Sequence, residues 1–331
     1  MNEQLPSLMD TYRDHFSIGA AISTRTMDVY SDLILKQFDS LTAENEMKFA
    51  ELQPEPSHYD FSKADTIMGF ARENGKKVRG HTLVWHNQTT NWVFTNAEGE
   101  LVTREELLER MQSHIETVVG RYKGQIYAWD VVNEAIEDHS ETYLRPSKWL
   151  QIIGPDFIDK AFEYAHLADP DALLFYNDYN ETNPTKRKKI IRLVRELQDR
   201  GVPIHGIGLQ AHWNIYGPSL AEIEEALQDY ASLGLPLHIT ELDLSVFRFE
   251  DRRTDVKEPS HAMLEAQAEA YDGIFQLFRA YRAHIDNVTF WGVADDYTWL
   301  DDFPVRGRKN WPFLFDEQHK PKESFFRVVD F

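Results

Sequence analysis

Residues 103–134 read TREELLERMQSHIETVVGRYKGQIYAWDVVNE, and two structural periods follow each other in this stretch. In the first part, the apolar residues recur at helical spacing, which predicts a helix over Arg104–Tyr122. Thr103 followed by Glu106 predicts a capping box at the start of that helix. The second part, Ile126–Val132, is a short apolar run typical of a strand buried in a parallel sheet.

The same alternation of strand and helix continues on both sides of this stretch. The predicted strands are Phe16–Ile22, Ser40–Thr42, Lys77–Gly80, Ile126–Val132, Leu173–Tyr176, Gly206–Gln210, Leu237–Thr240 and Asn287–Gly292. The other clear helical patterns are Thr185–Arg200, Leu220–Leu233 and Ala262–Ala283. Eight such units in alternation imply a parallel sheet with helical crossovers. Their even spacing over about 300 residues favours a single α/β domain over residues 1–331, a closed (β/α)8 TIM barrel.

Composition and local sequence exclude several classes of protein. The chain has 331 residues and a net charge of −20, which argues against a nucleic-acid partner and against an anionic membrane surface. There is no cysteine, so disulfides, thiolate metal sites and cysteine nucleophiles are excluded. No G-x-G-x-x-G turn follows the first predicted strand, which disfavours an open nucleotide-binding sheet.

Polar and aromatic residues gather where the predicted strands end. In a barrel of this kind these ends form one surface, and active sites lie there. The ends carry amides, carboxylates, imidazoles and indoles together, with Lys48 as the one cation at these tips. Such a set suits a carbohydrate, because sugars offer hydroxyls to amides and acids, and apolar faces to tryptophan. We interpret Trp129 and Trp149 instead as core residues.

Two carboxylates, Glu134 after the fourth strand and Glu241 after the seventh, predict glycoside hydrolysis. That reaction needs a proton donor and a second carboxylate that faces the anomeric carbon. An alternative reading of Asn133-Glu134 is a plain helix start with Asn133 as its N-cap. No H-E-x-x-H motif occurs, and His81 and His86 lack helical metal-ligand spacing, so we expect no metal and no cofactor.

The strings GHTLVWHNQ, WDVVNEA, YNDYN, QAH and ITELD, in this order, resemble glycoside hydrolase family 10, the endo-β-1,4-xylanases. The resemblance runs from about Phe16 to the end of the chain. It implies a retaining (β/α)8 barrel in which Glu134 is the acid/base and Glu241 the nucleophile. The implied substrate is xylan or short xylo-oligosaccharides, and the alternative is another retaining β-1,4-glycanase, a cellulase or mannanase. A catalytically inactive sugar-binding protein is the third reading.

The resemblance also assigns substrate-binding positions. The residues that would hold the glycone xyloses are Glu44, Asn45, Lys48, Trp85 and Gln88. Those that would line the cleavage point are His81, Asn133, Asn177, Tyr179, Gln210 and His212, with Trp291 and Trp299 covering the sugar and Asp243 pairing with His212 behind the nucleophile. Two positions depart from the family pattern, Ala211 where serine is usual and Thr90 where proline is frequent.

Elementary electrostatics adds two expectations about the glutamates. Glu134 must begin protonated, so we expect nearby negative charge and tryptophan burial to raise its pKa. Glu241 must stay ionised, and Gln210 and His212 are its expected hydrogen-bond donors. The first sixteen residues contain no apolar run of signal-peptide length, and no binding module is appended, so we expect action inside the cell.

Overall fold

The computed structural model describes residues 5–138 and 141–331. Its strands are β1 (Ser17–Ile22), β2 (Ser40–Ala43), β3 (Lys77–Trp85), β4 (Ile126–Asn133), β5 (Leu173–Asp178), β6 (Gly206–Leu209), β7 (His212–Asn214), β8 (Leu237–Ser245) and β9 (Ile285–Phe290). Neighbouring strands pair in parallel in the order β6-β5-β4-β3-β2-β1-β9-β8, and a further β6–β8 pairing closes the ring. The short β7 extends beside the end of β8. The predicted eight-stranded TIM barrel is confirmed.

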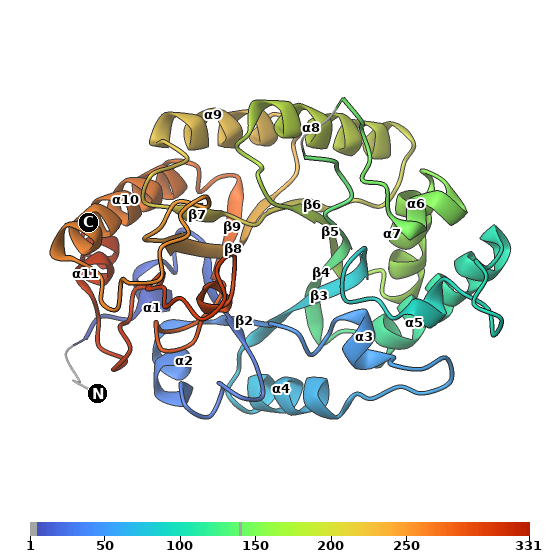
Figure 1. Ribbon diagram of the computed structural model, residues 1–331, viewed down its shortest axis with the longest axis horizontal. Coiled ribbons are helices and arrows are strands. Elements are labelled where there is room, and N and C mark those ends of the chain that lie inside the picture. Colours follow the sequence, from blue (N-terminus) through green and yellow to red (C-terminus); the bar gives the residue numbers. More distant parts are fainter. Residues whose placement is uncertain (1–4, 139–140) are drawn as a thin grey trace.

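The helices form an outer ring around these strands (Figure 1). They are α1 (Leu8–Thr11), α2 (Ser31–Gln37), α3 (Phe49–Leu52), α4 (Ser62–Glu73), α5 (Arg104–Arg121), α6 (Lys148–Ile153), α7 (Phe157–Ala168), α8 (Pro184–Asp199), α9 (Leu220–Ala231), α10 (His261–Ala280) and α11 (Glu323–Val329), with 3-10 turns at Asn91–Val93 and Trp299–Asp301. At least one helix lies between each barrel strand and the next along the chain. Every strand therefore directs its carboxyl end towards the same mouth.

Predicted helix boundaries agree with the structure to within three residues, but the predicted capping box at α5 is only half formed. The Thr103 side chain accepts a hydrogen bond from the Glu106 backbone N–H, as expected. The Glu106 carboxylate does not complete the box, because it pairs with Arg110 one turn further along the helix. The i,i+4 ion pair competes successfully with the cap for this carboxylate.

Two strands extend further into the mouth than their apolar runs predicted. β3 continues from Gly80 to Trp85, and β8 continues from Thr240 to Ser245. In both extensions the strand carries polar side chains that point into the site, so the sequence there does not read as a buried strand. The alternative reading of Asn133 as a helix N-cap is wrong, since Asn133 ends β4 and the next helix, α6, begins at Lys148.

Large side chains fill the barrel beside glycine. A Cβ atom added to Gly80 would lie 2.2 Å from the ring of Trp129, and one added to Gly206 would lie 2.2 Å from Phe175. Trp129 and Trp149 are both buried, as predicted. Only glycine lets these rings approach the neighbouring strand so closely.

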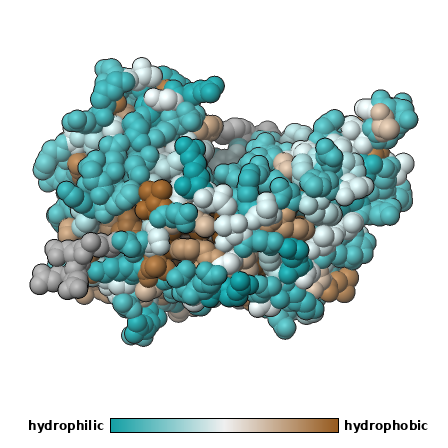
Figure 2. Space-filling model, turned by 90° about the horizontal axis from the view of Figure 1, so that it is seen from below, coloured by the Kyte–Doolittle hydropathy of each residue, from teal (hydrophilic) through white to brown (hydrophobic). Residues whose placement is uncertain are grey.

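The face of the molecule drawn in Figure 2 is mostly hydrophilic. Figure 2 shows one face with hydrophobic residues in small groups, and its upper edge is hollowed between two raised parts. Within residues 5–138 and 141–331, no helix has the length and apolarity needed to cross a membrane.

Candidate active site

The two glutamates singled out by the sequence lie at one mouth of the barrel. Glu134 directly follows β4, and Glu241 lies within β8. Strands β5 and β6 lie between β4 and β8 on the shorter way around the barrel. Both are nearly buried, with 9% of Glu134 and 5% of Glu241 exposed. Asn177 on β5 stands between them, because its amide donates to Glu241 Oε1 at 2.8 Å and to Asn133 Oδ1 at 2.9 Å. Asn133 in turn donates to Glu134 Oε1 at 3.3 Å.

Glu241 is held in its ionised form. His212 Nε2 lies 3.1 Å from Glu241 Oε2, and His212 Nδ1 lies 2.9 Å from Asp243 Oδ2. Burial favours the neutral imidazole, but the charges of Asp243 and Glu241 outweigh it and raise the pKa of His212 to about 10. Burial likewise opposes the charge on Glu241, yet its bond to His212 and the nearby His81 bring the pKa of Glu241 below its ordinary value. The predicted pairing of Asp243 with His212 is confirmed.

Glu134 has the opposite character. Burial, followed by the negative charge of Asp178, raises the pKa of Glu134. Hydrogen bonds from Trp85 Nε1 at 2.8 Å and Gln210 Nε2 at 3.1 Å oppose this rise without reversing it. The predicted direction is therefore found, although Asp178 contributes more than Glu241. The expectation that Gln210 bonds Glu241 is wrong, since its side chain turns towards Glu134 and leaves Glu241 to Asn177 and His212.

A second group of polar residues lies on the β2 and β3 side of the mouth. Asn45 Oδ1 accepts from Lys48 Nζ at 2.9 Å and from Gln88 Nε2 at 3.3 Å. The Lys48 ammonium lies 5.0 Å from the ring centroid of Trp85, within cation–π range. Glu44 is buried, and burial raises its pKa to about 7 against the opposing charge of Lys48. The structure thus brings together all five residues that the resemblance assigned to the glycone.

Aromatic residues close the other side. The rings of His81 and Trp291 meet edge to face, with their centroids 5.3 Å apart. The ring centroids of Trp299 and His212 are 4.9 Å apart. Trp299 Nε1 also donates to Asp243 Oδ2 at 2.8 Å, which links this wall to the His212 pair. The hydroxyl of Tyr179, which was predicted to line the cleavage point, donates to Asp138 Oδ2 and accepts from Arg145 Nη2.

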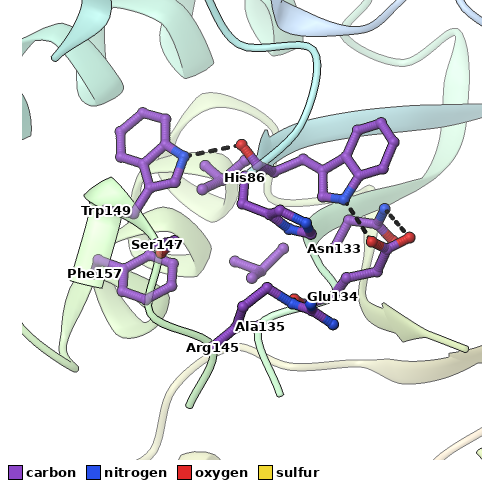
Figure 3. Close-up of a pocket in the computed structure, with 11 residues that line it drawn as sticks. His86, Asn133, Glu134, Ala135, Arg145, Ser147, Trp149 and Phe157 are labelled. Atoms are coloured by element: carbon purple, nitrogen blue, oxygen red, sulfur yellow. Dashed lines mark hydrogen bonds between the residues drawn. The ribbon is translucent and has the colours of Figure 1, made fainter. Parts of the chain in front are cut away.

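A small pocket, with room for about one water molecule, lies beside Glu134. Figure 3 shows Glu134, Asn133 and His86 on one side of it and Trp149 and Phe157 on the other. Burial and the charge of Arg145 lower the pKa of His86 to about 4, so this imidazole is neutral at ordinary pH. The described residues contain no group of three or more His, Cys, Asp and Glu arranged to hold a metal ion.

The sequence model of glycosyl hydrolase family 10 matches residues 7–331. The chain belongs to glycosyl hydrolase family 10. The resemblance inferred from the five motifs is thereby confirmed, and the chain is a retaining glycoside hydrolase.

Named relatives of this family 10 chain are xylanases. Endo-1,4-beta-xylanase B of Paenibacillus barcinonensis is 58% identical over 329 residues and covers 99% of both chains. An endo-1,4-beta-xylanase of Geobacillus stearothermophilus is 57% identical over 332 residues, with full coverage of both. Among solved structures, a P. barcinonensis xylanase complexed with a conduramine derivative superposes with a TM-score of 0.98 at 58% identity and 99% coverage of each chain.

Sequence reasoning missed several charged residues that support the site of this family 10 barrel. Arg79 and Asp130 form a fully buried ion pair below the mouth, and His81 Nδ1 lies 2.9 Å from Asp130 Oδ2. Burial opposes the charge on Asp130, but Arg79 and His81 lower its pKa below the ordinary value. Arg79 and Asp130 each lie inside a predicted strand, and this position was the available signal, because a buried charge needs a partner.

Proposed function

We propose that the chain is an endo-1,4-β-xylanase that cleaves xylan or xylo-oligosaccharides by double displacement, with Glu134 as acid/base and Glu241 as nucleophile. The observation that carries the two roles is the opposite pKa shift of two carboxyls at one barrel mouth. The xylanase names and full-length coverage of the relatives support this substrate, and they do not favour the cellulase or mannanase alternative.

In the first step, the Glu241 carboxylate attacks the anomeric carbon while the Glu134 proton passes to the leaving oxygen. The glycosidic bond breaks, and a glycosyl ester on Glu241 forms. The negative charge of Glu241 then disappears, which lowers the pKa of Glu134 and lets it ionise. In the second step Glu134 takes a proton from water, the water oxygen attacks the same carbon, and the ester bond breaks.

The proposal distributes the remaining polar residues along the bound sugar. The glycone xyloses contact Glu44, Asn45, Lys48, Trp85 and Gln88. The unit at the cleavage point contacts His81, Asn133, Asn177, Tyr179, Gln210 and His212, under Trp291 and Trp299. His212, kept charged by Asp243, holds the nucleophile ionised and in place.

Leaving groups separate the two glutamates experimentally. Glu134→Ala loses roughly 10²–10⁴-fold on natural xylo-oligosaccharides, but still forms the glycosyl-enzyme from dinitrophenyl xylobioside, whose leaving group needs no proton. Azide then attacks the ester and yields a β-glycosyl azide. Glu241→Ala is nearly inactive on both substrates, and azide attacks once to yield the α-azide. Equal loss of Glu134→Ala on both substrates, or α-xylose as the first product of the unaltered enzyme by proton NMR, contradicts the assignment.

We propose the cell interior, with short soluble xylo-oligosaccharides as substrates, as the place of action. Fractionation of the producing cells tests this location. Most activity in the medium without lysis, or a higher specificity constant on insoluble xylan than on xylotetraose, rejects it.

A further inference from the structure

The turn that follows β4 holds Glu134 in an unusual backbone conformation. Glu134 has a φ of 57°, in the left-handed region that residues with a side chain rarely adopt. Its own N–H donates to the Asn177 carbonyl at 2.9 Å, which continues the β4–β5 pairing. The peptide groups that follow Glu134 lie beyond β4, so side chains from other elements must hold them.

One set of contacts comes from Tyr176 on β5. Its hydroxyl accepts from the backbone N–H of Ala135 at 3.0 Å and from that of Ile136 at 3.1 Å. A hydroxyl has two acceptor sites and one proton, so both acceptor sites are filled. The proton is donated to Asp178 Oδ2. Tyr176 therefore binds the turn in this way only while Asp178 offers an acceptor.

A second set of contacts comes from Arg145. Its Nε donates to the Glu134 carbonyl at 2.9 Å, and its Nη2 donates to the Ile136 carbonyl at 3.3 Å and to Asp138 Oδ2 at 3.1 Å. Figure 3 shows the Arg145 side chain beside Ala135 and Glu134. The turn is thus held through its N–H groups by Tyr176 and through its carbonyls by Arg145.

Lys186, in the first turn of α8, joins the two sets. Its Nζ lies 2.7 Å from Asp178 Oδ1 and 2.6 Å from Asp138 Oδ1, and its side chain is 1% exposed. It also lies 3.6 Å above the ring of Tyr179. Two cations and two carboxylates balance in this buried network, which meets the requirement that buried charges be paired.

We propose that Lys186 is a positioning residue for Glu134. By pairing Asp178 and Asp138 at once, it fixes Tyr176 and Arg145 on the turn, and the turn aims the Glu134 carboxyl at the leaving oxygen. The proposal rests on the acid/base role of Glu134 proposed above. Loss of the network misplaces the acid while the nucleophile Glu241, on β8, keeps its own partners Asn177 and His212.

The test compares Tyr176→Phe and Lys186→Met with Tyr12→Phe as the matched control. Tyr12, the residue after α1, is buried, and its hydroxyl also accepts one bond, from Arg279 at 2.9 Å, and donates one, to the Val328 carbonyl at 2.6 Å. The readout is kcat/KM per folded enzyme, which reports glycosylation, on xylotetraose and on dinitrophenyl xylobioside. Lys186→Met leaves two buried carboxylates without their shared cation and can prevent folding. In that case Tyr176→Phe still tests whether the network positions Glu134.

We expect Tyr176→Phe to lose about 10- to 100-fold on xylotetraose, because a small displacement of a general acid has this effect, and to be nearly unchanged on the dinitrophenyl substrate. Lys186→Arg restores part of the xylotetraose activity that Lys186→Met loses. Asp178→Asn moves the basic limb of the kcat/KM profile to lower pH, because the Asp178 charge helps to raise the pKa of Glu134. The other charged or titratable groups around Glu134 are Glu241, Lys48, Arg145 and His86.

Equal losses of Tyr176→Phe on both substrates, or losses no larger than those of Tyr12→Phe, overturn the positioning role. Glu134→Ala in the same assay separates this failure from failure of the proposed function. If Glu134→Ala discriminates between leaving groups and Tyr176→Phe does not, only the positioning role falls. If Glu134→Ala does not discriminate, the acid/base assignment falls and the positioning role with it.

Discussion

Replacing Asp243 by asparagine tests whether His212 carries a positive charge in the folded protein. Asp243 Oδ2 accepts from both His212 and Trp299, whereas Oδ1 has no hydrogen-bond partner within the described residues. An asparagine oxygen in the Oδ2 position keeps both bonds, and its amide takes the unbonded position. The substitution therefore removes the charge with little change of shape.

The size of the effect follows from the pKa of His212, which rises from 6.5 to about 10, a difference of about 3.5. Burial opposes the rise, and of the four favourable contributions from Asp243 and Glu241 the charge of Asp243 is the largest. Removing that charge therefore lowers the pKa of His212. A fall of about one pKa unit corresponds to roughly 1 kcal/mol of folding free energy.

The sign of the pH dependence is fixed by linkage. Because the folded pKa of His212 is raised, its stabilisation is complete below pH 6.5 and is lost as the pH rises through 10. We expect urea unfolding to show Asp243→Asn destabilised by on the order of 1 kcal/mol more at pH 6 than at pH 10. Comparing the two proteins at both pH values cancels groups that titrate equally in each. An equal difference at pH 6 and pH 10 refutes the charged His212.

Three further predictions concern the site and the barrel. Trp85→Phe removes a hydrogen bond that lowers the pKa of Glu134, so the basic limb of kcat/KM should move to higher pH; an unmoved limb contradicts this. Glu44 has a pKa of about 7, and its ionised form binds hydroxyls more strongly, so KM for xylotetraose should fall as pH rises through 7 in the unaltered enzyme. Glu44→Gln should abolish that change, and persistence of the change would assign it elsewhere. Gly80→Ala drives a Cβ into Trp129 and should destabilise the barrel by about 1–3 kcal/mol, measured as a lower urea midpoint. An unchanged midpoint would show that the neighbouring strands move apart to accept the methyl group.

The barrel was predictable because its strands and helices have distinct periods that repeat eight times. The failures lie where strands enter the site. β3 and β8 change register between His81 and Val84 and between Ile239 and Leu242, and such bulges redirect successive side chains into the mouth. Polar residues on an irregular strand look like loop residues in sequence, so the predicted strands stopped too early.

The two glutamates were predictable because each follows or lies near the end of an apolar run. The partners of Gln210 were not, because Ala211 has a φ of 60° and this conformation separates the directions of Gln210 and His212. Lys186 was also missed. It reads as one of several cations on an exposed helix, and only the tertiary structure shows that it is buried between Asp138 and Asp178.

Consecutive residues of β5 point to opposite sides of the strand. Asn177 points towards Glu241, and its neighbours Tyr176 and Asp178 point towards α8. This alternation restricts how the enzyme can be recombined with other barrels. A chimera whose junction lies between β5 and α8 would take Asp178 and Lys186 from different parents. Junctions placed after α8 keep that pair together, so β5 and α8 should be exchanged as one unit, with the segment that carries Asp138 taken from the same parent.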